Sequence, residues 1–436
     1  MNEQKIYDMI GVGIGPFNLS LAALIEPIDE IEALFFEQSD SFEWHPGMLI
    51  EGMDLQTPFL ADLVTFANPQ SPYTFVNYLH EHNRLYQFYF FNRFDIPRKE
   101  YNEYCKWVLS QLKFCHFGHQ VVDVLDHTNI EKPYYEVVVF HPKNGKKQSY
   151  YCKHLVLGTG GVPNVPDGFE GYPSEDVLHT SQYLEYEKNL KQSKSITVAG
   201  SGQSAAEVFY DLLLEQKYYN YELTWFTRSG GFFQKEEAKL GTEVFSPEYV
   251  HYFHHLPFEQ RLDALDTLDP VRNGVDPKIL KGIYDLLYNR SIQQELAVTI
   301  QPTTELNGIK KANKTYQLSC TQWQEDHDFT YETEKLILAT GYKPKLPDWL
   351  NRFEDKILWE DDKRFKVTED YRLTFKTERK NALFTLTNIE HSHGASATNL
   401  GLSVLRNQKV INTIAGREIY PEPTKAVFQQ FSQKLN

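Results

Sequence analysis

The chain has 436 residues, of which 41% are hydrophobic and 24% charged, a composition typical of a soluble globular protein with two or three domains. A formal net charge of -15 argues against nucleic-acid binding, because polyanions are bound by clustered Lys and Arg side chains. The sequence has no run of 18 or more apolar residues and no secretory signal. We therefore expect a cytoplasmic protein with no membrane partner.

The N-terminal segment predicts a strand, a glycine-rich turn, a helix and a second strand. The strand covers 6–10, the turn is GVGIGP at 11–16, the helix lies around 18–24, and the second strand ends at Glu37. Such a turn lets the backbone approach a pyrophosphate, which the N–H groups of the following helix then face. Glu37 stands where an acidic residue accepts hydrogen bonds from ribose, although surface strand ends often carry Glu for no such reason.

The central part of the chain returns twice to a predicted sheet. Helices are expected over 73–79 and 101–112, and a hairpin around 144–145. An apolar strand at 154–157 ends in small residues, and a similar one at 336–339 precedes Thr340 and Gly341. Sheets of this kind bind nucleotides at such strand ends.

A second nucleotide unit begins at residue 195. Its strand, 195–199, leads into the turn GSGQSA at 200–205, a helix over 205–214 and a strand over 223–226. Arg228 then stands where the 2′-phosphate of NADP requires a cation, which favours NADPH over NADH. Two such units in one chain point to a flavin enzyme reduced by a nicotinamide.

Two further patterns concern metals and redox chemistry. The four cysteines are scattered without a CxxC pair, so they are expected to be buried free thiols. His391 with His393, and His254 with His255, lack a third ligand at a recognisable spacing, so no metal site is expected.

The segment 232–300 is helical and aromatic, which predicts an insertion that covers a pocket.

Taken together, several motifs resemble the N-hydroxylating flavin monooxygenases, which hydroxylate lysine, ornithine or diamines for siderophores. They are GVGIGPFNLSL at 11–21, WHPGM at 44–48, LQTPFLADLVT at 55–65, GSGQSA at 200–205, ATGY at 339–342, and HG with NLGLS at 393–394 and 399–403. The resemblance covers almost the whole chain and is closest to the diamine branch.

The resemblance implies an α/β fold with two Rossmann-like domains and a small helical substrate-binding portion. The FAD domain would comprise 1–185 and 336–436, and the NADPH domain 186–335 with the insertion at 232–300. Carried over residue by residue, cofactor contacts are implied at Gly11, Gly13, Gly15, Pro16, Glu37, Trp44, His45, Met48, Gln56, Gly200, Gly202, Gln203, Ser204, Arg228, Thr340, Gly341 and Leu402. Family members are often tetramers, so a homo-oligomer is expected.

The chemistry implied by the resemblance starts with reduction of FAD by NADPH. Oxygen then adds at flavin C4a, and the hydroperoxide transfers its distal oxygen to the amine. A primary amine has a pKa near about 10.4, so the site must favour its neutral form. No residue of the sequence is identified as the base.

One departure from the family pattern narrows the range of possible substrates. Amino-acid hydroxylases of the family commonly have Lys before the Asp-Leu motif, where its cation holds the substrate carboxylate, but this chain has Ala61. A buried carboxylate without a partner is costly, which favours putrescine or cadaverine. Histamine remains an alternative, as do lysine or ornithine if another cation such as Lys239 replaces the missing one. Ser403, Glu243 and Tyr249 are further candidates for the substrate site, the last two as partners of a distal ammonium.

Three rival functions remain open at this stage. A flavin disulfide reductase needs a redox-active cysteine pair that the sequence lacks. A ketone or sulfide monooxygenase needs a linking signature that is only degenerate here. A nucleotide-binding sensor without activity would bind FAD and never oxidise NADPH in the presence of an amine.

Overall fold

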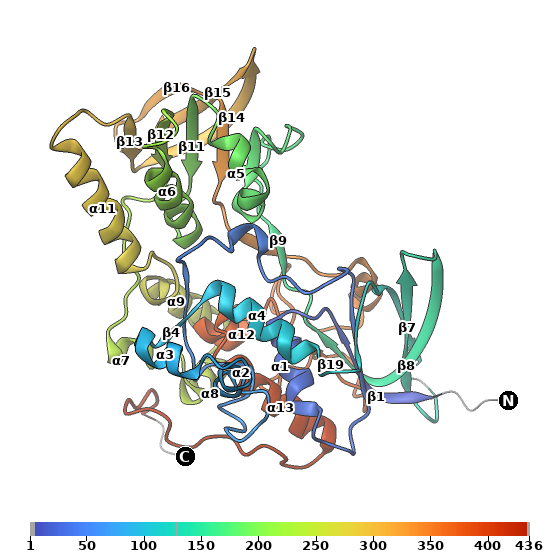
Figure 1. Cartoon of the computed structure of the whole chain (residues 1–436). Coiled ribbons are helices and arrows are strands. Elements are labelled where there is room, and N and C mark those ends of the chain that lie inside the picture. The colour runs from blue at the N-terminus through green and yellow to red at the C-terminus, as the bar shows by residue number, and fades with distance from the viewer. Residues whose placement is uncertain (1–4, 128–129, 434–436) are drawn as a thin grey trace.

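The structure, a computed structural model, describes residues 5–127 and 130–433 and arranges them in two lobes (Figure 1). One lobe contains the N-terminal strand and the last helix, and the other contains the middle of the chain. Among the described residues, no helix has the length and apolar character needed to cross a membrane.

The first lobe is built on a sheet to which distant parts of the chain contribute. Its strands β5, β2, β1 and β8 are parallel, and so is β19, which also pairs with β8. From β8 the sheet continues antiparallel through β7 and β6. The strands in sheet order are β5 (Cys115–Phe117), β2 (Ala33–Glu37), β1 (Ile6–Val12), β8 (Lys146–Leu157), β7 (Tyr134–His141) and β6 (Gln120–His127), with β19 (Leu383–Thr385) beside β8.

Helix α1 (Pro16–Ile25) is almost fully buried because α13 (Ser403–Ala415) packs against it. Asn407 of α13 donates from Nδ2 to the carbonyl of Phe17 at 2.9 Å and to Oγ of Ser20 at 2.9 Å. The C-terminal part of the chain therefore completes the fold around the first glycine turn.

The second lobe contains a parallel sheet in the order β10 (Val177–His179), β17 (Lys335–Leu338), β11 (Ser195–Ala199), β12 (Glu222–Phe226) and β13 (Val298–Gln301). Helices α5 (Tyr183–Leu190) and α6 (Gln203–Glu215) and an antiparallel sheet of β14 (Thr304–Ala312), β15 (Thr315–Gln322) and β16 (His327–Thr333) complete it. Strand β10 lies before the expected boundary at 186, and β17 runs across the one at 335. The chain crosses between the lobes at β9 (Gly161–Pro163) and β18 (Tyr342–Pro344), which pair antiparallel.

The expected helical insertion is divided between the lobes. Its helices are α7 (Lys239–Thr242), α8 (Pro247–His254), α9 (Phe258–Thr267), α10 (Asp269–Arg272) and α11 (Pro277–Ser291). Helix α11 packs on α6, whereas α8 and α9 pack on α12 (Glu390–His393) and on the short helix η4 (Gly394–Thr398). The end of the expected range, 298–300, belongs to strand β13.

Further short elements lie within the segment 44–65 and in the chain that follows it. They are η1 (Pro46–Met48), β3 (Asp54–Pro58), α2 (Phe75–Glu81), α3 (Leu85–Phe91), β4 (Asp95–Pro97) and α4 (Arg98–Leu109), with η2 (Thr180–Gln182) and η3 (Asp348–Phe353) elsewhere. The expected helices at 73–79 and 101–112 correspond to α2 and α4, and the expected hairpin to β7 and β8.

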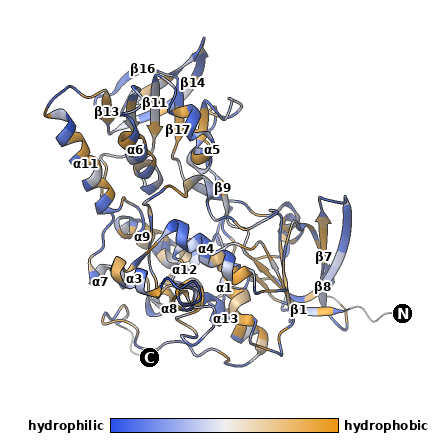
Figure 2. Ribbon diagram, in the orientation of Figure 1, coloured by the Kyte–Doolittle hydropathy of each residue, from blue (hydrophilic) through white to orange (hydrophobic). Residues whose placement is uncertain are grey.

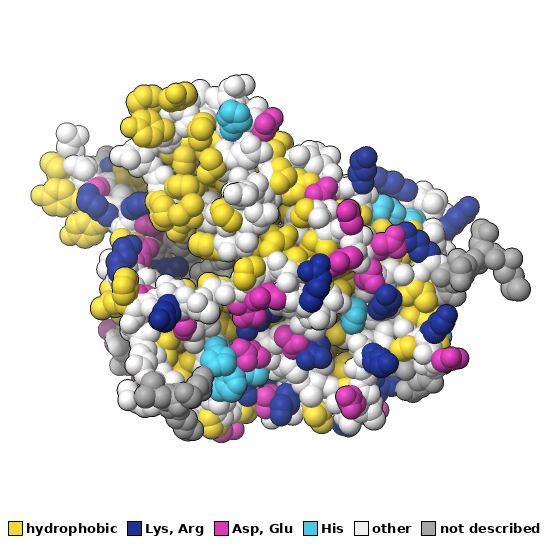
Figure 3. Space-filling model, turned by 90° about the horizontal axis from the view of Figure 1, so that it is seen from below, with side chains coloured by type: hydrophobic (Ala, Val, Ile, Leu, Met, Phe, Trp, Pro, Cys, Tyr) yellow, Lys and Arg dark blue, Asp and Glu magenta, His cyan; other side chains and the backbone are white. Residues whose placement is uncertain are grey.

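Hydrophobic residues fill the strands of both sheets and the inner faces of the helices (Figure 2). All four cysteines are free thiols, as expected: Cys105, Cys152 and Cys320 are buried and Cys115 is partly buried. On the face seen from below, Lys and Arg are interspersed with Asp and Glu (Figure 3).

A buried ion pair joins the two lobes. Arg98, at the start of α4, donates from Nη1 and Nη2 to the two carboxylate oxygens of Glu207 on α6, at 2.7 and 2.6 Å. The side chains are only 11% and 1% exposed. Arg98 also donates to the carbonyl of Met48 at 2.8 Å. The planar guanidinium therefore fixes η1 relative to α6.

We expect Glu207→Gln to lower the free energy of unfolding by about 3 kcal/mol, because it leaves the buried Arg98 cation without a counter-charge. Urea unfolding followed by circular dichroism measures the loss. The matched control is Arg352→Gln, which breaks an exposed pair with Asp123 and should cost less than about 1 kcal/mol. Equal losses in the two variants would contradict the role assigned to Glu207.

Candidate active site

The first glycine turn links β1 to the N-terminus of α1. Gly13 has φ of +85°, and a Cβ there would lie 2.5 Å from the carbonyl oxygen of Gly158 at the end of β8. Gly15 is the N-cap of α1 with no side-chain cap, Pro16 is at the first helical position, and a Cβ on Gly15 would meet nothing within 4 Å. The N-terminus of α1 thus has no side-chain cap and lies beside open space at Gly15, as an anion site requires.

Three side chains contact this turn. The side-chain amide of Asn18 donates to the carbonyl of Gly13 at 2.7 Å, and Gly11 packs against the ring of Phe35. Glu37, at the end of β2, accepts a hydrogen bond from the N–H of Ile14 at 2.9 Å. The expected ribose acceptor therefore lies beside the turn and also has a structural role there.

The segment 44–48 lies against the connection between the lobes. The ring of Trp44 packs edge-on against Tyr101, and Nδ1 of His45 is 3.2 Å from the hydroxyl of Tyr342. Burial lowers the pKa of His45 to about 4, so the ring is neutral at pH 7. Met48 is buried, and a Cβ on Gly47 would overlap the backbone of Ser181, which shows how closely η1 and η2 approach.

Gln56 carries an unpaired buried donor. Its backbone is left-handed, with φ of 58°, and within the described part of the chain Nε2 has no hydrogen-bond partner. A buried amide is normally paired, so this atom is suited to an acceptor on a bound group.

Ala61 is held in place by its neighbour Asp62. The buried carboxylate of Asp62 accepts hydrogen bonds from the N–H groups of Val64, Thr65 and Phe75 at 2.7 to 2.9 Å. Ala61 is 7% exposed and lies so close to Gly401 that a Cβ on that glycine would be 2.8 Å away. The methyl group thus faces the closing segment 399–403.

The same segment carries two other expected site residues. Leu402 precedes α13, and its N–H donates to Oδ1 of Asn399 at 3.3 Å. Ser403 is buried, and its hydroxyl donates to the carbonyl of Leu400 at 2.6 Å. The fold therefore brings the sequence segments of Ala61 and Ser403 together, although the hydroxyl of Ser403 already has an acceptor.

The second glycine turn repeats the first. Gly200 has φ of +145°, and a Cβ there would lie 2.4 Å from the carbonyl oxygen of Ala339. Gly202 is the N-cap of α6, again without a side-chain cap, and a Cβ on it would meet nothing within 4 Å. Ser204 follows in the first turn of α6 and is partly buried.

The side chains around this turn differ in whether their polar groups are already hydrogen-bonded within the protein. Gln203 donates to Glu207 at 2.8 Å and accepts from the N–H of Asp276 at 2.8 Å, so both ends of its amide are engaged. Arg228, after β12, has a side chain that is 79% exposed, with its Nη1 3.7 Å from the carboxylate of Glu305. Of these side chains, that of Arg228 is available to a ligand.

Thr340 and Gly341 follow β17 at the crossing between the lobes. The hydroxyl of Thr340 donates to the carbonyl of Asn164, and the carbonyl of Gly341 lies 3.0 Å from Nε2 of His179. These two residues hold the crossing strands together.

Glu243 and Tyr249 are occupied by the C-terminal segment of the chain. The carboxylate of Glu243 accepts hydrogen bonds from the N–H groups of Phe428 and Gln429 at 3.1 and 3.0 Å, which lower its pKa. Tyr249 is 7% exposed and packs edge-on against the ring of Phe431. The contacts that the described residues show for Glu243 and Tyr249 are thus with the C-terminal segment, and their role at the substrate remains a prediction.

Sequence reasoning missed Arg98 and Asp62, which position the site through other residues. An arginine directly after a proline, at the start of an amphipathic helix, is the only local signal of Arg98, and its partner Glu207 is 109 positions away.

Comparison with known proteins identifies the family. Residues 5–344 match the family model of L-lysine 6-monooxygenase/L-ornithine 5-monooxygenase. A putrescine N-hydroxylase of Acinetobacter baumannii is 38% identical over 99% of this chain and 95% of its own length.

Two solved structures extend the comparison. The FAD-bound cadaverine monooxygenase of the desferrioxamine pathway of Erwinia amylovora is 37% identical, with a TM-score of 0.94 over 99% of this chain and all of its own. An ornithine N-hydroxylase of Kutzneria, with reduced FAD, NADP+ and L-ornithine, is 26% identical, with a TM-score of 0.88 over 94% and 99% of the two chains. The chain thus belongs to the L-lysine 6-monooxygenase/L-ornithine 5-monooxygenase family, the N-hydroxylating flavin monooxygenases that its motifs resemble.

Proposed function

We propose that the protein uses FAD, NADPH and O2 to N-hydroxylate a primary diamine, putrescine or cadaverine, for hydroxamate siderophore biosynthesis. The main support for a diamine substrate is Ala61, which places a small neutral side chain where amino-acid hydroxylases of the family commonly have Lys. The putrescine and cadaverine enzymes among the relatives support the same class.

The residues of the first turn fit FAD. The uncapped N-terminus of α1 and the open space beside Gly15 suit a pyrophosphate, and the unpaired Nε2 of Gln56 suits an acceptor on the flavin. When bound and reduced, FAD supplies the oxygen activation. Trp44, the neutral His45 and Met48 of the segment 44–48 would supply the flat and apolar neighbours that an isoalloxazine needs.

The second turn fits NADPH. The uncapped N-terminus of α6 and the space beside Gly202 would hold the pyrophosphate, and the exposed guanidinium of Arg228 would pair with the 2′-phosphate. The Arg98–Glu207 pair then holds α6, and with it this dinucleotide, against η1.

The substrate amine must reach its neutral form before it accepts oxygen. A free amine with a pKa of about 10.4 is mostly protonated at pH 7. Burial of the reacting amine in a site closed to water disfavours its charged form. A lysine at this position would hold a carboxylate but would repel the second ammonium of a diamine.

Gly15→Ala and Gly202→Ala test the two cofactor sites separately. Both glycines have negative φ, and a Cβ on either would meet nothing within 4 Å, so alanine should lower the apoprotein's melting temperature only by the small cost of a poorer helix N-cap. We expect Gly15→Ala to lose bound FAD, measured from the flavin absorbance of the purified protein. Gly202→Ala should retain FAD and raise KM for NADPH about tenfold or more, because the methyl group occupies the pyrophosphate site. Loss of FAD in both variants would contradict the assignment.

Arg228→Gln tests the choice of nicotinamide. We expect KM for NADPH to rise about tenfold, which corresponds to about 1.4 kcal/mol of lost charge pairing, while KM for NADH stays within about twofold. Steady-state NADPH and NADH oxidation with saturating amine measures both. A matched control is Arg352→Gln, an exposed arginine in the other lobe. Equal changes for the two nucleotides would contradict a 2′-phosphate contact.

Ala61→Lys and Ala61→Met test the substrate class. Hydroxylamine product is measured with putrescine, cadaverine, histamine, lysine and ornithine. The unaltered enzyme should hydroxylate a diamine and not lysine or ornithine. Both replacements add similar length to a buried position, but only Lys adds charge, so kcat/KM for putrescine should fall about tenfold further in Ala61→Lys than in Ala61→Met. Equal losses, or product from lysine with the unaltered enzyme, would refute the argument from Ala61.

A further inference from the structure

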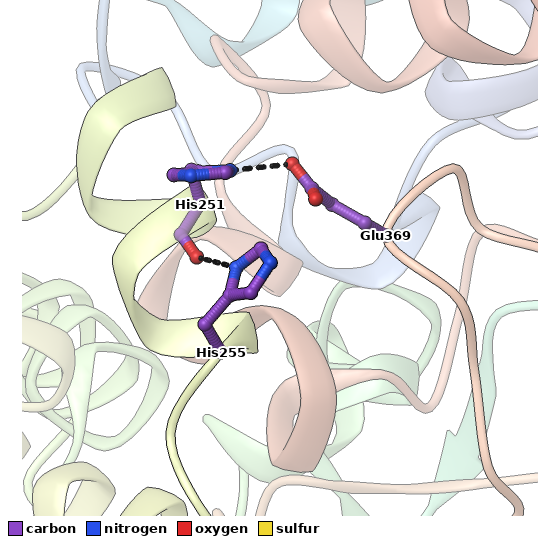
Figure 4. A group of neighbouring side chains, drawn as sticks. All are labelled: His251, His255 and Glu369. Atoms are coloured by element: carbon purple, nitrogen blue, oxygen red, sulfur yellow. Dashed lines mark hydrogen bonds and ion pairs between the residues drawn. The ribbon is translucent and has the colours of Figure 1, made fainter. Parts of the chain in front are cut away.

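Two histidines at the C-terminal end of α8 and a carboxylate from a distant segment form a cluster outside the site described above. His251 and His255 are four positions apart, so their imidazoles lie on one face of the helix. Glu369 belongs to the segment before β19. One ligand atom from each of the three side chains lies within 4.8 Å of the others. Figure 4 shows the two rings and the carboxylate converging across the gap between α8 and this segment.

The hydrogen bonds of the cluster prepare it for a metal. Nδ1 of His255 lies 2.8 Å from the backbone carbonyl of His251, an acceptor that requires the proton on that nitrogen. Nε2 of His255 is then left with its lone pair, the arrangement of a metal-binding histidine oriented by a carbonyl. His251 approaches Glu369 directly, with Nδ1 2.9 Å from Oε1.

One cation competes at this cluster. Nζ of Lys409, on α13, is 3.0 Å from the same oxygen of Glu369. Lys409 has a second carboxylate partner, Glu422, at 3.5 Å. A divalent cation can therefore bind the carboxylate of Glu369 while the ammonium of Lys409 remains paired with Glu422.

We propose that His251, His255 and Glu369 bind a divalent transition-metal ion of the zinc class. Two imidazoles and one carboxylate are a common ligand set for zinc, with water as the fourth ligand, whereas Mg²⁺ and Ca²⁺ prefer oxygen ligands alone. Both imidazoles are exposed, so they can turn towards a common ion at little cost.

The bound ion ties α8 to the segment before β19. Helix α8 packs on η4, which precedes the closing segment at Ser403. Because the side chains of His251 and His255 are exposed, the ion can reach the site from solvent. The site is independent of the amine chemistry proposed above.

Calorimetric titration of untagged, FAD-loaded enzyme with ZnCl2, after dialysis against EDTA, tests the proposal. We expect one saturable event per chain in the micromolar range, and none with MgCl2. His255→Asn and Glu369→Gln should each weaken zinc binding about tenfold or more, because each removes one of three ligands. His327→Asn, at an exposed histidine of β16, is the matched control and should bind as the unaltered enzyme does.

Thermal unfolding gives a second readout. At one zinc concentration, the metal should raise the melting temperature of the unaltered enzyme and of His327→Asn by the same amount, and that of His255→Asn by less, since stabilisation by a ligand falls as its affinity falls. Retained FAD absorbance confirms that each variant is folded. No saturable event with zinc, or equal affinity in all variants, would overturn the proposal.

Discussion

The buried pair between Arg98 and Glu207 is the constraint on which the arrangement of the two lobes depends. In each lobe one parallel strand, β1 or β11, leads into a glycine turn. Two cofactors bound at these turns can take part in one reaction only if both turns face a common space. A bidentate ion pair with a fixed plane is better suited to this than apolar packing, which tolerates sliding. Because Arg98 also holds the carbonyl of Met48, one side chain connects η1 with the helix that starts at the second turn.

A second constraint acts within the first lobe, around the residue that we propose sets the substrate class. The carboxylate of Asp62 accepts hydrogen bonds from backbone N–H groups and is therefore not available to bind a ligand. The neighbouring Ala61 is fixed against Gly401 and cannot be replaced by a long side chain without displacing the closing segment or pointing into the site. If position 61 sets the substrate class as proposed, it does so through the available space as well as through the charge of the side chain.

The sequence was sufficient for the elements whose signals are local. Both strand–turn–helix units lie where GVGIGP and GSGQSA predicted them, because positive φ at Gly13 and Gly200 and close backbone approach admit only glycine. The sheet to which a strand belongs was harder to predict. Strands β10 and β17 pair with each other at a distance of more than 150 residues, and nothing local distinguishes them from strands of the first sheet.

The same reasoning explains why individual side chains were harder to assign than motifs. Glu243 and Tyr249 were chosen as partners of an ammonium because acidic and aromatic groups attract cations. In the fold, the backbone of Phe428 and Gln429 and the ring of Phe431 engage them first. The sequence alone does not show which residues surround a charged side chain, and these neighbours determine what the side chain can bind.

The histidines of α8 illustrate the opposite case, since their proposed third ligand, Glu369, is 118 positions beyond His251 in the sequence. An incomplete ligand set in one segment of a chain therefore excludes a metal site only when the fold brings no further donor to it.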